Sequence, residues 1–191
     1  LSILIVGALQ AQTTDNCACQ DRVNVQLDDN CQFVLDITNV QSGNCAGNYV
    51  IVDDDVRNGN IVDCAGLWPY AIFDNDDNFI CDGVISATDL KGPEVVRNRR
   101  VVNRIECTYI NELRNNPNTI DPNSKFYLGE VEFEDNCASC GCNVTRKFFD
   151  EVDFRDCNDN NIVARMTRTW TGEDCDGNQT VETQTFNFVR P

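Results

Sequence analysis

Hydrophobic and polar side chains alternate along several short stretches of this chain. The period of two is clearest in residues 22–28, 32–38 and 162–167. The side chains that share one face of each stretch are Val23, Val25 and Leu27; Phe33, Leu35 and Ile37; and Ile162, Ala164 and Met166. Such alternation predicts half-buried β-strands. Only the stretch 107–116 shows even a weakly helical pattern.

Clusters of Asn, Asp and Gly separate these stretches. They lie at 27–31, 42–44, 57–60, 74–78, 157–161 and 175–178. These residue types tolerate left-handed backbone and form side-chain-stabilised turns, so they are typical of hairpin ends. Many short strands at regular spacing, with turns between them, predict an all-β chain built from β-sandwiches.

The cysteine content indicates the cellular compartment in which the protein folds. The chain of 191 residues has twelve Cys and no His, and such a density is typical of secreted proteins whose thiols are oxidised. We expect disulfides rather than zinc sites, because most of the Cys are spread along the chain instead of clustering with His. The expected disulfide cysteines are Cys17, Cys19, Cys31, Cys45, Cys64, Cys81, Cys107, Cys137, Cys140, Cys142, Cys157 and Cys175.

The cysteines also suggest a division of the chain. A boundary near Pro93 leaves six Cys on either side, which predicts a first module over 17–92 and a second over 93–191, after an N-terminal segment 1–16. Six Cys allow 15 pairings within each module, so the sequence does not give the connectivity. For the dense cluster 137–142 we expect partners at Cys107, Cys157 or Cys175, with redox exchange or metal binding as the alternative.

The net charge of −16 disfavours binding to nucleic acid or to anionic membrane surfaces. The charge is uneven, since residues 1–92 carry only three basic side chains against 14 Asp. The second half opens with a basic strip of four arginines. These are Arg97, Arg99, Arg100 and Arg104.

The strongest apolar run is the N-terminal segment 1–9, which is too short to span a bilayer. Its composition fits the hydrophobic region of an export signal. It equally fits an apolar donor strand that completes the sheet of another subunit. In the second case the contact residues are Leu1, Ile3, Leu4, Ile5, Val6 and Leu9, together with the four arginines.

Two parts of the sequence carry a family resemblance. The segment from Cys19 to Val95, with its "VQLDDNC" hairpin and "CDG" turn, resembles modules of secreted and surface proteins of Bacteroidetes. The "RTWTGEDCDGN" motif at 168–178 is similar to a hallmark of hyalin-repeat-like immunoglobulin domains, although Cys175 is two residues from Gly177 rather than next to it. The resemblance implies two tandem disulfide-rich, Ig-like β-sandwich modules in an extracellular or cell-surface protein.

No catalytic constellation is recognisable in the sequence. Without His there is no Ser-His or Cys-His nucleophile system, and there is no phosphate-binding glycine motif, so we do not expect an enzyme. We expect no cofactor except a structural calcium ion, for which Asp74, Asp76 and Asn78 offer oxygen ligands at alternate positions. The runs 53–55 and 174–178 offer similar sets, and the alternative is acidic turns on an acidic surface.

The tryptophans have simpler interpretations. Trp170 is expected to be a core residue between two sheets. A sugar-binding platform would require Trp68 and Tyr70 to be exposed together. Core packing is the alternative for Trp68.

These features lead to two hypotheses. The first is a structural subunit of an extracellular filament or surface fibre, whose partners are copies of itself in a homopolymer joined head-to-tail by strand addition and charge complementarity. The alternative is a secreted adhesive or carbohydrate-binding module, assisted by calcium. Only the first predicts long regular polymers.

Overall fold

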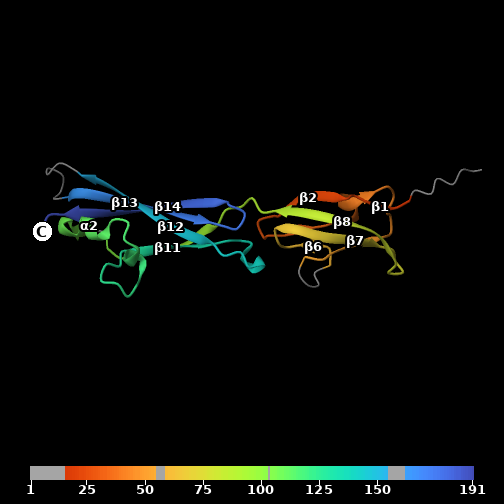
Figure 1. The fold of residues 1–191 in the computed structure, drawn as a ribbon, viewed down its shortest axis with the longest axis horizontal. Helices are drawn as coiled ribbons and strands as arrows, with labels where there is room; N and C mark the ends of the chain where they lie inside the picture. The colour runs from red at the N-terminus through yellow and green to blue at the C-terminus, as the bar shows by residue number, and fades with distance from the viewer. Residues whose placement is uncertain (1–15, 55–58, 103, 155–161) are drawn as a thin grey trace, which may run out of the picture. The chain divides into compact units, whose positions relative to one another are not determined.

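The structure is a computed structural model that describes residues 16–54, 59–102, 104–154 and 162–191 (Figure 1). The chain forms two compact units. Among the described residues, the first consists of those within 16–25, 33–62 and 66–87, and the second of those within 26–32, 63–65 and 88–191. Residues 26–32 and 63–65 therefore interrupt the first unit in the sequence but belong to the second.

The first unit is built around a four-stranded sheet in the order β2-β8-β7-β5, with two small two-stranded sheets, β1-β4 and β3-β6. Its core contains Leu35, Val40, Val62, Ile72 and Ile85, all fully buried. Its elements are β1 (Ala18–Cys19), β2 (Arg22–Gln26), β3 (Phe33–Val34), α1 (Ile37–Val40), β4 (Gln41–Ser42), β5 (Tyr49–Val52), β6 (Ile61–Val62), β7 (Gly66–Phe73) and β8 (Phe79–Thr88).

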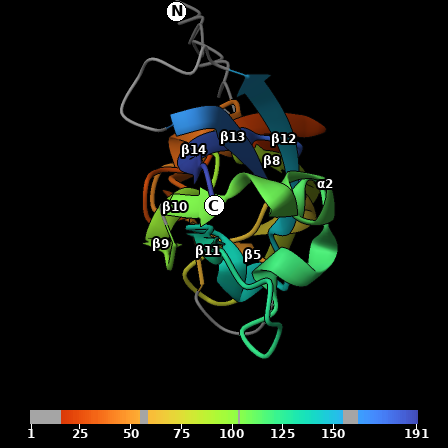
Figure 2. The ribbon, with the colours of Figure 1, turned by 90° about the vertical axis from the view of Figure 1, so that its left-hand side faces the viewer.

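The second unit has a four-stranded sheet in the order β10-β14-β13-β12 and a two-stranded sheet of β11 and β9. Figure 2 shows the two sheets as separate layers. The elements are β9 (Glu94–Arg100), β10 (Arg104–Glu106), η1 (Cys107–Tyr109), α2 (Ile110–Leu113), η2 (Pro117–Ile120), β11 (Gly129–Glu134), η3 (Ala138–Cys140), β12 (Thr145–Phe154), β13 (Ile162–Glu173) and β14 (Gln179–Val189).

Close packing joins these two layers. A Cβ atom at Gly172 of β13 would lie 2.6 Å from the ring of Phe133 of β11, so only glycine allows the sheets to approach this closely. The buried Gln184 accepts a hydrogen bond from the Trp170 indole and donates to Asn98 on β9. The second unit is thus a two-layer β-sandwich, and the all-β prediction is confirmed.

The strand patterns predicted from sequence hold in two stretches and are wrong in one. Residues 22–28 contain β2, and in 162–167, the start of β13, Ala164 and Met166 are buried as expected. In the stretch 32–38 the strand ends at Val34, because Asp36 caps the short helix α1. Its side chain accepts a hydrogen bond from the Thr38 N–H, while the Asn39 side chain accepts one from the Asp36 N–H. In 107–116 the weak helical pattern corresponds to η1 and one turn of α2.

A buried ion pair lies at the centre of the second unit. The guanidinium of Arg168 binds the carboxylate of Asp150 through two bonds of 2.8 Å, and neither side chain is exposed. The guanidinium also lies 4.0 Å from the centre of the Phe148 ring. Asp150 accepts a further bond from the Asn115 N–H, which ties the segment after α2 to β12. Both charges are therefore compensated inside the core.

None of the helices in the described ranges is long and apolar enough to cross a membrane.

Removing one partner of the buried pair should be costly, because the other charge is then left uncompensated. We expect Asp150→Ala to lower the free energy of unfolding by about 3–5 kcal/mol in chemical denaturation. Lys147→Ala removes the exposed partner of Glu173 and should cost less than about 1 kcal/mol. Equal effects of the two substitutions would contradict this assignment.

Candidate functional site

Three turns in the described part of the chain share one design. In residues 28–32, 74–78 and 174–178 the first residue is Asp, and its Oδ1 accepts hydrogen bonds from the N–H groups two and four positions later. The N–H of each Asp in turn donates to the carbonyl of the fifth residue. The fourth residue has left-handed backbone in every case, and is Cys31, Asp77 or Gly177. In the sequence, Asp28 and Asp74 fall in turn clusters and Asp174 directly precedes one, but the local pattern does not give the shared hydrogen bonding.

The segment 135–142 is a fourth turn, and it positions three cysteines. The Asp135 Oδ1 accepts a bond of 2.7 Å from the Cys137 N–H, which bends the chain after β11. The 3₁₀ helix η3 follows, and Gly141 ends it in left-handed backbone. Cys137, Cys140 and Cys142 consequently reach three different parts of the second unit.

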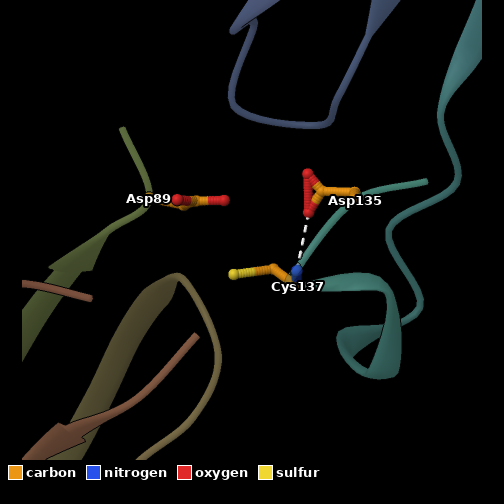
Figure 3. A group of neighbouring side chains, drawn as sticks. All are labelled: Asp89, Asp135 and Cys137. Atoms are coloured by element: carbon orange, nitrogen blue, oxygen red, sulfur yellow. Dashed lines mark hydrogen bonds between the residues drawn. The ribbon is translucent and has the colours of Figure 1, made fainter. Parts of the chain in front are cut away.

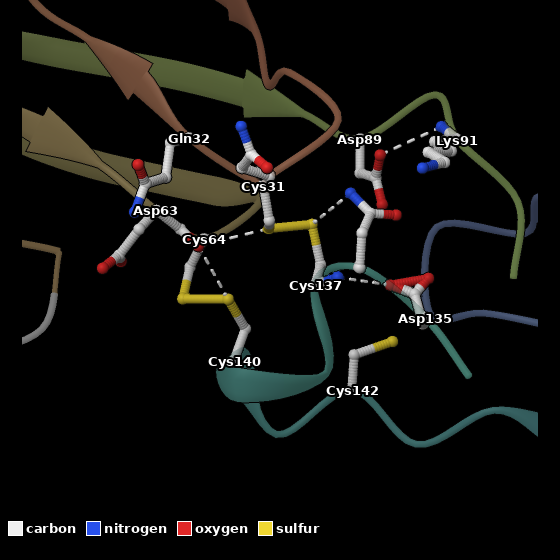
Figure 4. Close-up of a disulfide and its surroundings, with 12 residues drawn as sticks. Cys31, Gln32, Asp63, Cys64, Asp89, Lys91, Asp135, Cys137, Cys140 and Cys142 are labelled. Carbon is white, nitrogen blue, oxygen red and sulfur yellow. Dashed lines mark hydrogen bonds between the residues drawn. A yellow bond between two sulfur atoms is a disulfide. The ribbon is translucent and has the colours of Figure 1, made fainter. Parts of the chain in front are cut away.

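Five disulfides are present among the described cysteines. Cys17–Cys45 and Cys19–Cys81 lie in the first unit, whereas Cys31–Cys137, Cys64–Cys140 and Cys142–Cys175 lie in the second. Figure 4 shows the Cys31 and Cys64 disulfides side by side on the 137–142 turn. The bond to Cys175 was expected from the sequence.

The other two partners of this cluster were not expected. Cys137 and Cys140 pair with cysteines 106 and 76 residues away, so an assumption of pairing inside residues 17–92 and 93–191 is wrong for these bonds. The reason is that residues 26–32 and 63–65 belong to the second unit. Cys107 was predicted to be disulfide-bonded and is instead a free, half-buried thiol in the structure. Cys157 lies outside the described residues.

Beside the 137–142 turn lies a cavity of about 160 Å³. Its lining includes Asp89, Asp174 and Asp176, the disulfides of this turn, and Ala65. Asp135 adds a fourth carboxylate, since an oxygen of Asp135, an oxygen of Asp89 and the Cys137 sulfur all lie within 4.8 Å of one another. In Figure 3 the side chains of Asp89 and Asp135 point toward one another. The cavity is therefore rich in carboxylate oxygen.

The proximity of these carboxylates changes their acidity. Burial raises the pKa of Asp135, and the negative charges of Asp89, Asp174 and Asp176 raise it further. Burial also raises the pKa of Asp176, with Asp174 and Asp89 adding to the effect. Both directions have the same cause, since burial and neighbouring negative charge each disfavour the ionised form of Asp135 and Asp176.

The calcium candidates Asp74, Asp76 and Asn78 lie in the second of these three turns, which joins β7 to β8. Hydrogen bonds from Asn78 lower the pKa of Asp74, and its carboxylate is occupied by N–H donors of its own turn. The side-chain amide nitrogen of Asn78 donates a hydrogen bond to Asp74, so this contact stabilises the turn between β7 and β8. Of the described residues, Asp89, Asp135 and Cys137, rather than this turn, bring ligand atoms together.

The residues predicted to contact another subunit fall into two sets. The apolar residues Leu1, Ile3, Leu4, Ile5, Val6 and Leu9 lie outside the described residues. In the basic strip, Arg97 binds Glu132 at 2.8 Å, and Arg100 donates to the Thr185 carbonyl. Arg99 lies 6.0 Å from the Tyr127 ring centre. Arg104 is exposed on β10, and no salt bridge in the described part of the chain includes it.

The sugar-platform interpretation of Trp68 and Tyr70 is wrong. Tyr70 is only 2 % exposed, and its hydroxyl donates to the backbone carbonyls of Gln20 and Val40. Trp68 is half-buried on the same strand. Trp170 is fully buried, as predicted for a core residue.

Comparisons with known proteins identify no family. No protein-family model matches the chain, and no curated protein matches it. Among solved structures, the chain is similar to extracellular cadherin domains 1–4 of protocadherin gamma B7, with 11 % sequence identity and a TM-score of 0.27. That match covers 91 % of this chain and 50 % of the protocadherin chain, so this chain spans half of the length of that structure.

The long-range disulfides make a direct prediction for a cleaved chain. A protease site inserted after the exposed Leu90 would separate residues 1–90 from the remainder. On a denaturing gel without reductant the cleaved protein should run as one band, because Cys31–Cys137 and Cys64–Cys140 hold the fragments together. With reductant it should give two bands.

The matched control is the double variant Cys31→Ser, Cys64→Ser, which should give two bands without reductant. If the cleaved protein with all of its native cysteines gave two bands without reductant, no disulfide would join residues 1–90 to the remainder, and the prediction would be wrong.

Proposed function

We propose that this chain is a load-bearing structural subunit of an extracellular filament or surface fibre. The coarser statement, a disulfide-rich β-protein of an oxidising, secreted or surface setting, follows from the fold and the five disulfides. The filament and its assembly are the proposal.

The observation that carries the proposal is the covalent route through the second unit. From Cys31 the disulfide to Cys137 bypasses residues 32–136, and from Cys142 the disulfide to Cys175 bypasses residues 143–174. A force that pulls on the two ends of the chain is therefore carried past residues 32–136 and 143–174 by the two disulfides. Most strands of the protein lie in these two bypassed segments. A protein that only binds a soluble ligand has no need of this protection.

A second disulfide, Cys64–Cys140, backs up the first. If Cys31–Cys137 is broken, Cys64–Cys140 still joins the 63–65 segment to the same turn. Both disulfides also close long loops, which restricts the unfolded chain and stabilises the fold by roughly 4–5 kcal/mol for a loop near 100 residues. The same arrangement therefore serves mechanical and thermodynamic stability.

Two sequence features support self-association as the way in which load is passed on. The apolar segment 1–9 has the composition of a donor strand, and the resemblance to Bacteroidetes surface modules points to an extracellular structural setting. The exposed Arg104 is available to an acidic neighbour, whereas Arg97 is neutralised by Glu132. Head-to-tail contacts of this kind propagate into a fibre.

The proposal predicts regular polymers in negative-stain electron microscopy of the oxidised full chain. Deleting residues 1–12 should leave monomers in gel filtration, because the donor strand is lost. Ile3→Ser with Ile5→Ser should have the same effect, and the matched polar control, Gln10→Ser with Gln12→Ser, should still polymerise.

Two results would contradict this account. If polymers still formed after deletion of residues 1–12, the hypothesis that they assemble by strand addition would be wrong. If the full chain stayed monomeric under all oxidising conditions, the hypothesis that it is a filament subunit would be wrong.

A further inference from the structure

Three aspartates line the cavity beside the 137–142 turn, and a fourth, Asp135, lies next to one of them, Asp89. Asp89 follows β8, Asp135 follows β11, and Asp174 and Asp176 lie in the β13–β14 turn. The exposed fractions of Asp89, Asp135 and Asp174 are 3 %, 7 % and 7 %, so three carboxylates are nearly removed from water. Buried carboxylates are rare unless they are paired or bind a metal ion.

Hydrogen bonds account for some of their oxygens but not for all. Asp174 is satisfied, because both of its oxygens accept bonds within its own turn. Asp89 Oδ1 accepts a bond of 2.9 Å from the Lys91 N–H. Asp135 Oδ1 accepts the Cys137 N–H, but Asp135 Oδ2 is fully buried and has no hydrogen-bond partner. An orphaned buried carboxylate oxygen indicates that a positive partner belongs there.

No basic side chain supplies that partner. Within the described ranges, none of the four aspartates forms a salt bridge with Lys or Arg. The nearest basic residue in the sequence, Lys91, has its ammonium bound to Glu94 at 2.9 Å and directed to Asp29 at 3.9 Å. The hydrogen bond that Lys91 donates to Glu94 is the main reason that the pKa of Lys91 is raised. Lys91 interacts with Asp89 through space, so among the described residues the cluster has no cation bonded to its carboxylates.

We propose that this cavity binds one Ca²⁺ ion through the carboxylates of Asp89, Asp135 and Asp176, with Asp174 fixing the turn. Two ligands of one Ca²⁺ ion lie at most about 5 Å apart, since each Ca–O distance is about 2.3–2.6 Å. The oxygens of Asp89 and Asp135 meet this limit, because they lie within 4.8 Å of one another. The cavity of about 160 Å³ leaves room for waters that complete the coordination.

The donor chemistry selects calcium over a softer metal. The nearby sulfurs of Cys137, Cys140 and Cys142 are all in disulfides, so none is a thiolate ligand for zinc. Only hard oxygen donors are left. The hairpin turn 74–78 has the same backbone design but lacks the buried carboxylates of the other segments, and it serves as an internal control.

The test compares thermal unfolding of the full oxidised chain in EDTA and in CaCl₂. Calcium at about a hundredfold excess over its Kd should raise the midpoint by roughly 5–10 °C. Asp176→Asn should abolish most of this shift, whereas Asp76→Asn, at the matching position of the other turn, should leave it unchanged. Equal concentrations of MgCl₂ should give a smaller shift.

A second variant separates metal binding from a structural role. Asp135→Asn keeps an oxygen acceptor for the Cys137 N–H and removes a charge, so its midpoint in EDTA should equal or exceed that of the unsubstituted chain. Its calcium shift should be lost. No calcium shift in the unsubstituted chain, a shift that survives in Asp135→Asn, or an equal shift with magnesium would overturn the assignment.

Discussion

The turn at 137–142 is the constraint on which the second unit depends. Its three cysteines join it to Cys31, Cys64 and Cys175, so that segments distant in the sequence are fixed to one short stretch of chain. Asp135 caps the start of the turn, backbone hydrogen bonds hold its middle, and Gly141 ends it in left-handed backbone. Because 26–32 and 63–65 are held there, the compact units do not coincide with a simple division of the sequence.

The second unit buries two groups of charged side chains, and only one of them contains its own balancing charge. Asp150 is fully compensated by Arg168 and by the Asn115 N–H. In the described ranges the cluster around Asp135 has no such cation, and burial together with neighbouring carboxylates raises the pKa of Asp135 and of Asp176. Burial of charge is unfavourable unless it is balanced. The first group is balanced by the chain's own residues, whereas the calcium site that we propose would supply the balancing charge for the second.

The sequence predicts the local features of this protein well and its long-range features poorly. Alternation locates β2 and β13, and Trp170 is buried as its motif suggests. Asp36 shows the limit of alternation, because a side-chain cap turned an apparent strand into a helix. Disulfide partners 76 and 106 residues apart, and the meeting of Asp89 with Asp135, depend on tertiary structure that no local pattern contains.

The load-bearing account is tested most directly by stretching single oxidised chains held at their two ends. The account predicts that residues 32–136 and 143–174 stay out of the extended chain, because Cys31–Cys137 and Cys142–Cys175 bypass them. Adding reductant should then lengthen the chain by roughly 450–500 Å, at about 3.3–3.6 Å per residue. Equal full extensions with and without reductant would contradict it.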